Sequence, residues 1–428
     1  MNQPYDRIRA LFPDNFGLAR GKYIPTEHAD KGARHCITMY ALAYDRSMVP
    51  TPGARLLEGL PDCDLNFSMD DVRPGWEENT GVVVGDLSFR GAPLAMSARQ
   101  VLKQALADWK TLGYTIKAGI ELEAYVMQPD GNGGWTDLKT PGAYVYGTGL
   151  AVDPTGLFDE IMRVARQCGF PVEAINSEYD TPQFELTLAY GDVLEAIDNI
   201  FLFKLMAREI AQKRGLMLTF LGKPFADRSG SGVHLNFSIE DSKGDNALAD
   251  SKSQDGLSTL AHQCIAGMLA HHQGMSAVCA PTVNAYKRLR PGSLAGYWAN
   301  WGYDHRGVTI RVPVERGKGA HLEHRMSDGA ANPYLATAII LQAARLGVVN
   351  KLTPPAAEDK DGLENISTDV HVPSDLNQAL TIFEADTELV KAIGEDFAAQ
   401  FITVKRAEWD KFAAAVTDWE INYYMPFI

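Results

Sequence analysis

The chain has 428 residues, which is enough for two domains or for one large domain with an appendage. Hydrophobic residues make up 46% and charged residues 22%, the ordinary proportions of a protein with a sizeable core. The formal net charge of −14 argues against a general nucleic-acid-binding protein, which needs a basic face, but it leaves room for phosphate-bearing ligands because bound divalent metals can supply positive charge locally.

The distribution of apolar residues changes near residue 97. Residues 17–95 hold short strand-like runs and many turn residues, with weak helical periodicity. From Val101 the apolar residues follow helical spacing as far as Leu112, and Gly113 supplies a stop. We therefore predict a small N-terminal domain over residues 1–97 and a larger domain over residues 98–428.

Helices and strands alternate in the larger domain, so we expect an α+β protein. Asp153 and Pro154 can cap and start a helix that Gly169 ends. Further helices are predicted over residues 193–214, 257–273 and 335–349. The polar segment 241–256 is predicted to be a surface loop.

Cysteine usage and apolar segments indicate the compartment. The five cysteines are an odd number without a CxxC pair, which predicts free thiols in a reducing compartment. The segment MNQPYDRIRALFPDNF lacks the long apolar stretch of a signal peptide. The most apolar helix candidate, over residues 335–350, is interrupted by Gln342 and Arg345 and is too short and too polar to span a bilayer. We expect a cytoplasmic protein without a membrane segment.

Five predicted strands of the larger domain alternate apolar and polar residues, so each has one apolar and one polar face. They are GIELEAYVM, QFELTLAY, SGVHLNFSI, GVTIRVPV and HLEHRM. Alternation alone is the normal pattern of an antiparallel sheet with one face in water. These polar faces differ in composition, because they carry acids, a histidine and arginines: Glu121, Glu123, Glu185, Glu323, His234, Arg311 and Arg325.

The composition of these faces predicts a metal site. Carboxylates and an imidazole suit Mg²⁺ or Mn²⁺, and four glutamates on sheet faces would repel one another without cations. A sheet curved into an open barrel would aim them at one cavity. Metals there would hold phosphates, and the arginines would neutralise the charge of a transferring phosphoryl group. The pattern therefore indicates phosphoryl transfer without identifying the acceptor.

Five motifs follow one another along the chain: GIELEAYV, SEYDTPQFE, GKPFADRSGSGVHLNFS, RLRPGS followed by DHRGVTIRVP, and HLEHRMSDGAANPYLATAIIL. They resemble, in the same order, motifs of the glutamine synthetases and of the related γ-glutamyl-amine ligases. The resemblance implies a small β-grasp-like N-terminal domain and a catalytic domain with a curved antiparallel sheet, an open barrel, backed by helices. It also implies an enzyme that uses ATP with Mg²⁺ or Mn²⁺.

The resemblance implies roles for individual residues. The metal that positions the carboxylate substrate would bind Glu123, Glu178 and Glu185, and the metal that bridges the ATP phosphates would bind Glu121, His234 and Glu323. The carboxylate substrate or its acyl phosphate would contact Gly230, His234, Arg288 and Arg325. The nucleotide would contact Glu173, Arg306 and Arg311.

The implied reaction has two steps. The γ-carboxylate of glutamate, or of a close analogue, attacks ATP to form an acyl phosphate, and an amine then attacks the acyl carbon. Arg306 and Arg325 are expected to be catalytic at the transferring group, and a base must take a proton from the amine. Asp62 or Asp64, in the segment GLPDCDLNF, could be that base. Family members build hexameric rings, which we expect here to be stacked as a dodecamer, with the small domain of one subunit completing the site of its neighbour.

One departure from the family pattern bears on the amine. Leu294 stands where glutamine synthetases carry a glutamate that helps to bind ammonium, and a leucine side chain offers neither charge nor acceptor. Tyr297, Trp298 and Trp301 follow it and could form a pocket for an alkyl or aryl group. We therefore expect an amine larger than ammonia, with Leu294 as a substrate-binding residue.

Three alternatives stay open on the sequence. A glutamine synthetase proper would use ammonia, and Leu294 is the feature against it. A guanidino kinase shares the catalytic barrel but lacks a small domain like residues 17–95. A non-catalytic structural or regulatory protein on this fold has no reason to retain six metal-binding side chains. Ser229, which replaces an asparagine usual beside the glutamate site, leaves room for a carboxylate other than glutamate.

Overall fold

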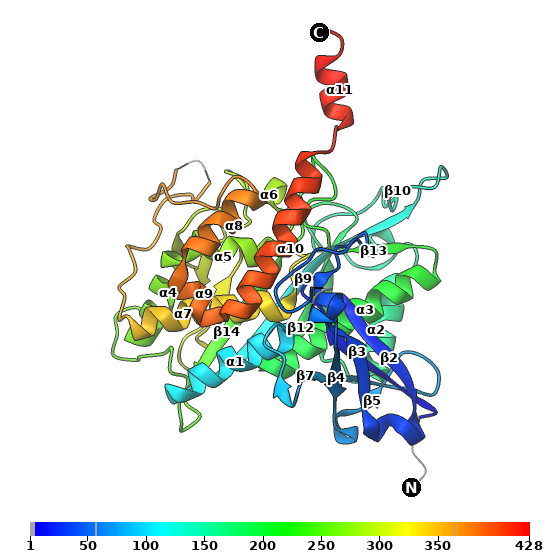
Figure 1. Ribbon diagram of the computed structural model, residues 1–428. Coiled ribbons are helices and arrows are strands. Elements are labelled where there is room, and N and C mark those ends of the chain that lie inside the picture. Colours follow the sequence, from blue (N-terminus) through cyan, green and yellow to red (C-terminus); the bar gives the residue numbers. More distant parts are fainter. Residues whose placement is uncertain (1–4, 56–57, 364) are drawn as a thin grey trace.

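The computed structural model describes residues 5–55, 58–363 and 365–428, so residues 1–4 and 56–57 of the predicted small domain lie outside the described residues. Figure 1 shows the N-terminal strands in blue beside a larger body in which helices pack on a long sheet. Both element types occur in the larger part, which confirms the α+β class.

The N-terminal part contains two four-stranded sheets. The first has the order β2-β1-β6-β5, built from β1 (Arg7–Pro13), β2 (Ala19–Pro25), β5 (Arg73–Pro74) and β6 (Thr80–Val84), with β1 and β6 parallel. The second has the order β3-β4-β7-β8, built from β3 (Ala33–Cys36), β4 (Asp62–Asn66), β7 (Asp86–Phe89) and β8 (Ala92–Pro93). The two sheets share a core that includes Ile8, Phe12, Tyr40 and Leu65. The β-grasp-like assignment and the division at residue 97 stay predictions.

The larger part is built on a nine-stranded sheet whose main path has the order β11-β12-β9-β14-β17-β16-β15, with β10 and β13 also paired to β9. The strands are β9 (Thr115–Pro129), β10 (Trp135–Asp137), β11 (Val172–Ser177), β12 (Gln183–Asp192), β13 (Met217–Thr219), β14 (Val233–Glu240), β15 (Trp301–Tyr303), β16 (Ile310–Val312) and β17 (Leu322–His324). All pairs are antiparallel except β15 with β16. The path runs from β11 to β15 without closing, so the sheet is not a closed barrel.

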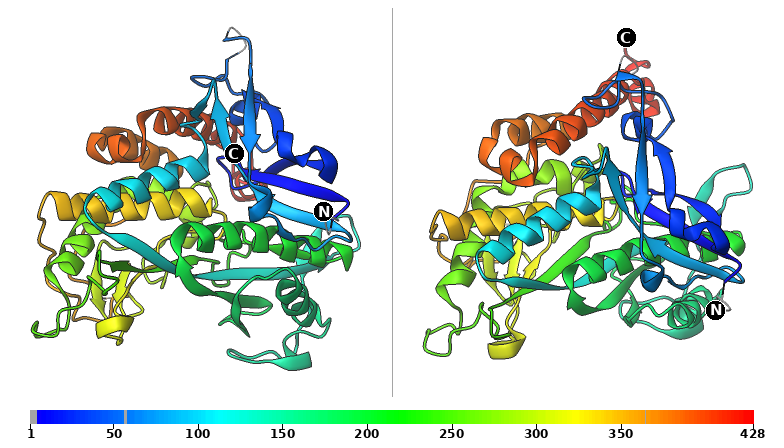
Figure 2. Two further views of the ribbon diagram at one scale, coloured as in Figure 1. Left: turned by 90° about the horizontal axis from the view of Figure 1, so that it is seen from below. Right: turned by 60° about the horizontal axis from the view of Figure 1, so that its bottom comes forward.

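Strand β9 shows why the sheet has one helix-covered face. Ile116, Ala118, Ile120 and Leu122 alternate with more exposed residues and belong to the main hydrophobic core. Helices α1 (Ala98–Thr111), α3 (Val193–Lys213) and α7 (Pro333–Val349) lie on the same side of the sheet in the views of Figure 2. The other face of β9 is therefore left for its polar residues.

Helix α7 crosses α4 (Thr259–Ala270) at close range, because glycine lies at the crossing on both helices. A Cβ added at Gly347 would lie 2.0 Å from the carbonyl oxygen of Gln263, and one at Gly267 would lie 2.2 Å from that of Ala343. No other residue leaves room for this backbone approach. The crossing fixes the helical layer behind the sheet.

Two predicted helices differ from the observed ones in their limits. Helix α2 (Leu157–Gln167) begins after the predicted start, because the Asp153 carboxylate accepts hydrogen bonds from the amides of Leu157 and Phe158 and so caps the helix from outside. The helix predicted over residues 257–273 is two helices, α4 and α5 (His272–Cys279). Segment 241–256 is a loop with turns, as predicted.

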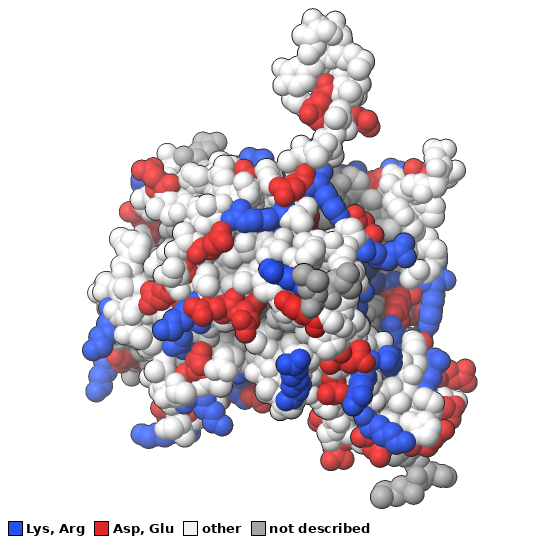
Figure 3. Space-filling view, in the orientation of Figure 1, with Lys and Arg blue, Asp and Glu red and all other residues white. Residues whose placement is uncertain are grey.

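The C-terminal region is helical and ends in an arm. It comprises α8 (Leu376–Ala385), α9 (Thr387–Ile393), α10 (Glu395–Ala413) and α11 (Asp418–Tyr424). The remaining described α-helix, α6 (Ala285–Arg288), is short and lies before β15 in the sequence. Helix α11 projects from the body and has no buried residue (Figure 1). Figure 3 shows that this arm carries few charged residues. Within the described ranges, every helix is too short or too polar to cross a membrane.

Candidate active site

The polar residues predicted on five strands meet as a ladder across the sheet. Glu123 of β9 lies opposite Glu185 of β12, and Glu121 lies opposite His234 of β14. Strand β17 lies between β14 and β16, and its Glu323 is opposite Asn236 of β14 and Arg311 of β16. Residues directly opposite on neighbouring strands share a face, so the register brings the acids together.

Three of these residues could hold one metal ion. One ligand atom from each of Glu121, His234 and Glu323 lies within 4.8 Å of the other two. His234 Nδ1 is 3.1 Å from a Glu121 carboxylate oxygen and 3.6 Å from one of Glu323. Two carboxylates and one imidazole are a suitable donor set for Mg²⁺ or Mn²⁺.

Charge within this group favours ionised carboxylates. Burial alone would raise the pKa of the Glu121 carboxyl, but the hydrogen bond and charge of His234 and the charge of Arg325 lower it to about 2. Burial also opposes ionisation of Glu323, and His234 and Arg325 again lower its pKa. Arg311 donates to the second Glu323 oxygen at 2.9 Å. Both acids are therefore available as anionic ligands.

The second predicted group of acids is Glu123, Glu178 and Glu185, and ionisation is disfavoured for Glu178 and Glu185. Burial raises the pKa of Glu185 to about 7, helped by the charges of Glu121 and Glu178. Burial and the charge of Glu123 raise the pKa of Glu178 as well. Carboxyl groups whose ionisation is opposed by burial and by neighbouring carboxylates are expected in a metal-binding cluster without its cation.

Arg288 lies buried directly beneath the loop that precedes β14. Its Nη1 donates to the carbonyl oxygen of Met326 at 2.8 Å, and a Cβ added at Gly232 would lie 2.4 Å from its Nη2. A Cβ at Gly230 would lie 2.6 Å from the Arg288 Cγ. Both glycines are thus required by this close approach, which holds a guanidinium against the backbone of the Gly230 loop.

The Gly230 loop is tied to the acidic group by a residue that the motifs did not assign. Gln183 is buried, and its Nε2 donates to the carbonyl oxygen of Gly230 at 2.8 Å and to Glu123 at 3.4 Å. The Gly232 amide donates to the same Glu123 carboxylate at 2.8 Å. The alternation placed Gln183 on the polar face, but only the register shows that it links the two parts.

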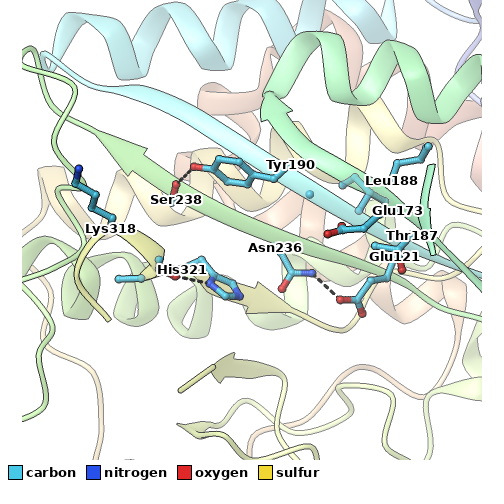
Figure 4. Close-up of a pocket in the computed structure, with 13 residues that line it drawn as sticks. Glu121, Glu173, Thr187, Leu188, Tyr190, Asn236, Ser238, Lys318 and His321 are labelled. Carbon is cyan, nitrogen blue, oxygen red and sulfur yellow. Dashed lines mark hydrogen bonds between the residues drawn. The ribbon is translucent and has the colours of Figure 1, made fainter. Parts of the chain in front are cut away.

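A cavity of about 410 Å³ opens beside Glu121. Figure 4 shows Glu121 and Glu173 at one end and Lys318 at the other, with Tyr190, Ser238 and His321 between them. The Asn236 amide donates to Glu121 at 3.1 Å, and Tyr190 is hydrogen-bonded to Ser238. The sequence reading assigned no role to Asn236, Tyr190 or Lys318. A cavity that adjoins the metal-binding acids at one end can take a phosphate-bearing molecule.

The two arginines expected at the phosphates lie in different environments. Arg325 is buried, is paired with Glu323, and reaches the carbonyl oxygen of Leu294 at 3.4 Å. Arg306 is exposed in the turn that follows β15, and its side chain contacts no acid of the cluster among the described residues. Its catalytic role stays a prediction.

Asp62 and Asp64 lie on β4 of the small domain, apart from the cluster within this chain. Asp64 pairs with Arg34 at 3.1 Å, and Asp62 lies opposite Cys36. Neither contacts Glu178, Glu185 or their neighbours among the residues that the structure describes. A role for either acid as the amine base therefore needs a second copy of the chain.

The prediction that Tyr297, Trp298 and Trp301 form a pocket for the amine is wrong for Trp301. Trp301 is 3% exposed, and its Nε1 donates to the carbonyl oxygen of Pro355 at 2.9 Å, so it belongs to the core. Tyr297 and Trp298 are half-buried and pack against His371. Leu294 is 51% exposed and is the apolar residue of this segment that faces solvent.

Comparisons with known proteins agree with this arrangement. The family described as the glutamine synthetase catalytic domain matches residues 95–424. A glutamine synthetase of Clostridium saccharobutylicum is 36% identical over 98% of this chain and 95% of its own length, and one of Pyrococcus abyssi (strain GE5 / Orsay) is 31% identical over 97% and 96%. The solved structure titled "Apo GmaS without ligand" has a TM-score of 0.86 at 28% identity, covering 98% of this chain and 97% of its own. The structure titled "GmaS/ADP complex-Conformation 1" also has a TM-score of 0.86, at 27% identity, covering 99% and 97%. The chain belongs to the glutamine synthetase family.

Proposed function

We propose that this protein is an ATP-dependent ligase that activates the γ-carboxylate of glutamate, or of a close analogue, and joins it to an amine. The observation that supports this most directly is the group Glu121, His234 and Glu323, whose ligand atoms converge beside a cavity of about 410 Å³. A similar solved structure is titled as a complex with ADP, which supports the binding of an adenine nucleotide by this chain.

The carboxylate substrate binds, in this proposal, beside the Gly230 loop and Arg288. Because neither Gly230 nor Gly232 has a side chain, Arg288 can lie close against the loop backbone. The buried guanidinium of Arg288 supplies a fixed positive charge for a carboxylate. Gln183 and Glu123 hold the loop in place, since each is hydrogen-bonded to it.

The phosphoryl group passes, in this proposal, beside Glu323, where Arg325 and Arg311 converge from neighbouring positions. Two guanidinium groups there would stabilise the negative charge that develops on the transferring oxygens. Divalent metals held by Glu121, His234 and Glu323, and by Glu123, Glu178 and Glu185, would act as Lewis acids toward the phosphate oxygens. Arg306, which is exposed, would reach the phosphates by movement of its turn.

The amine is larger than ammonia in this proposal, because Leu294 exposes an apolar side chain. Leu294 also lies beside Arg325, whose Nη2 donates a hydrogen bond to the Leu294 carbonyl oxygen. Burial of one methylene group contributes about 0.8 kcal/mol, and about 1.4 kcal/mol corresponds to a tenfold change. A few carbons on the amine would therefore improve its use by one to two orders of magnitude. Glutamine synthesis from ammonia is the second candidate, since the curated relatives compared above are named glutamine synthetases.

The amine base is Asp62 or Asp64 of a neighbouring copy in this proposal, because neither acid reaches the cluster of its own chain. Such an arrangement requires a homo-oligomer, and hexameric rings stacked as a dodecamer are the form we propose. Small molecules are the only other partners that the proposal needs.

An amine panel tests the proposal. The full-length protein is incubated with ATP, glutamate and Mg²⁺ or Mn²⁺, and phosphate release is measured with ammonia, alkylamines, amino alcohols and polyamines. We expect release that depends on glutamate and amine together and is greatest for an amine with carbon to bury. Release with ammonia as the best acceptor would favour glutamine synthesis, and no amine-dependent release in any metal would refute the ligase.

A further inference from the structure

A second cavity of about 410 Å³ lies away from the cavity of Figure 4 and shares no lining residue with it. Its walls come from the turn between β1 and β2, from helix α3, from β13 and the residues after it, and from residues 329–331. The cavity thus lies where the small N-terminal part meets the larger one.

Two positively charged side chains line this cavity, and none of its described lining residues is acidic. Lys204 and Arg208 are one helical turn apart on α3, a spacing at which like charges repel. Lys204 donates to the carbonyl oxygen of Gly329 at 2.8 Å, a neutral acceptor. Arg208 forms no hydrogen bond or ion pair among the described residues. Burial and the charge of Arg208 lower the pKa of Lys204 to about 8, although Asp328 acts in the opposite direction.

The rest of the wall is apolar and aromatic. Phe16 is stacked on Tyr44, with ring centroids 4.3 Å apart, and the Phe220 ring lies 4.7 Å from Lys204 Nζ. Phe201 and Leu205 of α3 complete the apolar side. A surface of this kind can bury a ring or an alkyl chain while the two cations face a charge.

We propose that this cavity binds a small organic anion, a carboxylate or phosphate monoester that carries an apolar or aromatic body. The anion lies between Lys204 and Arg208 and relieves their repulsion, and its apolar body packs against Phe16, Phe201 and Leu205. The cavity is large enough for a ring with one charged substituent, and its composition excludes cations, since no acidic residue lines the described wall.

The position of the cavity connects it to the candidate active site. Gly329, which accepts the Lys204 hydrogen bond, follows Asp328, and Asp328 is paired with Gly232 as an isolated β-bridge. Gly232 lies over Arg288 and bonds to Glu123. An anion that draws Lys204 from Gly329 would therefore act on the segment that supports the Gly230 loop, so we expect its effect on turnover to appear as a change in the KM for the carboxylate substrate.

Calorimetric titration with phenyl phosphate and with phenylacetate, as separate probes, tests the proposal on the full-length protein. Arg208→Met removes a charge from the cavity while keeping an unbranched apolar stem, and Lys213→Met removes a charge from the exposed end of the same helix as a matched control. We expect at least tenfold weaker binding of both probes to Arg208→Met and unchanged binding to Lys213→Met. Lys204→Met should weaken binding similarly, and ethylbenzene, which lacks the charge, should not bind.

Three results would overturn the proposal. The first is the absence of binding by both probes at millimolar concentration. The second is equal affinity for the unaltered chain and for Arg208→Met, which would assign the binding to the candidate active site or to the general surface. The third is a changed molecular mass of Arg208→Met with unchanged probe affinity, which would make the cavity a contact between copies of the chain. None of these results bears on the ligase activity itself, which the amine panel measures.

Discussion

Replacement of Glu185 by glutamine should stabilise the metal-free protein at alkaline pH. Burial and the charges of Glu121 and Glu178 raise the pKa of Glu185 to about 7, above the usual glutamate value of 4.5. A carboxyl group whose pKa is raised by folding contributes stability that is fully present when the pH is below its pKa in the unfolded chain. This stability is lost as the pH rises through its pKa in the folded protein. Glutamine resembles the protonated acid, so the variant keeps at high pH the stability that the unaltered chain loses.

The magnitude follows from the shift. The difference between about 7 and 4.5 is about 2.5 pH units, and at about 1.36 kcal/mol per unit this gives an upper limit of about 3 kcal/mol at pH 8.5. At pH 5 the same linkage gives less than about 1 kcal/mol. Because Glu178 shares the repulsion, the observed gain should fall below the upper limit.

Urea unfolding in the presence of EDTA at pH 5 and pH 8.5 measures this difference, with Glu173→Gln, an exposed acid on the neighbouring strand β11, as the matched control. Calorimetry of Mg²⁺ binding near pH 6.5 gives a second readout, because the unaltered chain should release a proton that the Glu185→Gln variant lacks. An equal gain at both pH values, or a loss at pH 8.5, would refute the assignment of Glu185 to a repelling cluster. Turnover by the variant should be abolished at either pH.

Three other substitutions address the metal, the amine and the helical layer. Glu323→Gln should abolish turnover while leaving the circular dichroism spectrum unchanged, because it removes a metal ligand and the partner of Arg325; near-normal phosphate release would contradict the role of the cluster. Leu294→Glu should shift the ratio of kcat/KM values toward ammonia by at least tenfold, and an unchanged ratio in the amine panel would remove Leu294 from the amine site. Gly347→Ala should lower the free energy of unfolding by about 1–3 kcal/mol, as overpacking typically does, because its Cβ would lie 2.0 Å from the Gln263 carbonyl oxygen; Gly191→Ala, whose Cβ would meet nothing within 4 Å, is the control and should cause a clearly smaller loss.

The alternation of residues was sufficient to predict which acids share a face, because a strand has a fixed period of two. It placed Glu121, His234 and Glu323 on the polar faces of their strands. The resemblance of the five motifs implied that these three residues bind one metal. The register that sets Glu121 opposite His234 could not be obtained in this way, since it depends on how strands distant in the sequence pair.

Side-chain environments that depend on packing were harder to predict. Trp301 follows Leu294 closely in the sequence, yet it lies in the core because the bond to the Pro355 carbonyl and the paired strand β16 turn it inward. The contact between Arg288 and Gly232 has no local signal either, since the two residues are far apart in the chain. Both cases are decided by the fold as a whole.

Two exposed features of the described chain are open to contact with another molecule. The pair of Asp64 and Arg34 is exposed, with 45% and 76% of the respective side chains accessible, so the pair contributes at most about 1 kcal/mol and leaves Asp64 free to meet another molecule. Helix α11 has seven residues, and isolated helices shorter than about 12–15 residues are marginal in water. Its Thr417 capping box contributes only about 1 kcal/mol, so the helix needs a surface to pack on.

A second copy of the chain is the partner that a homo-oligomer always supplies, and the composition of the arm supports it. Trp419 is 62% exposed, Phe427 85% and Ile428 95%, so a contact that covered them would bury a large apolar area. The double substitution Trp419→Asp with Phe427→Asp should therefore lower the mass measured by light scattering, since charges would enter that contact. If the amine base comes from a neighbour, turnover with amine should fall with the mass, while the secondary structure of each chain is retained. An unchanged mass with unchanged turnover would show that the arm makes no such contact and that the site needs no second copy through it.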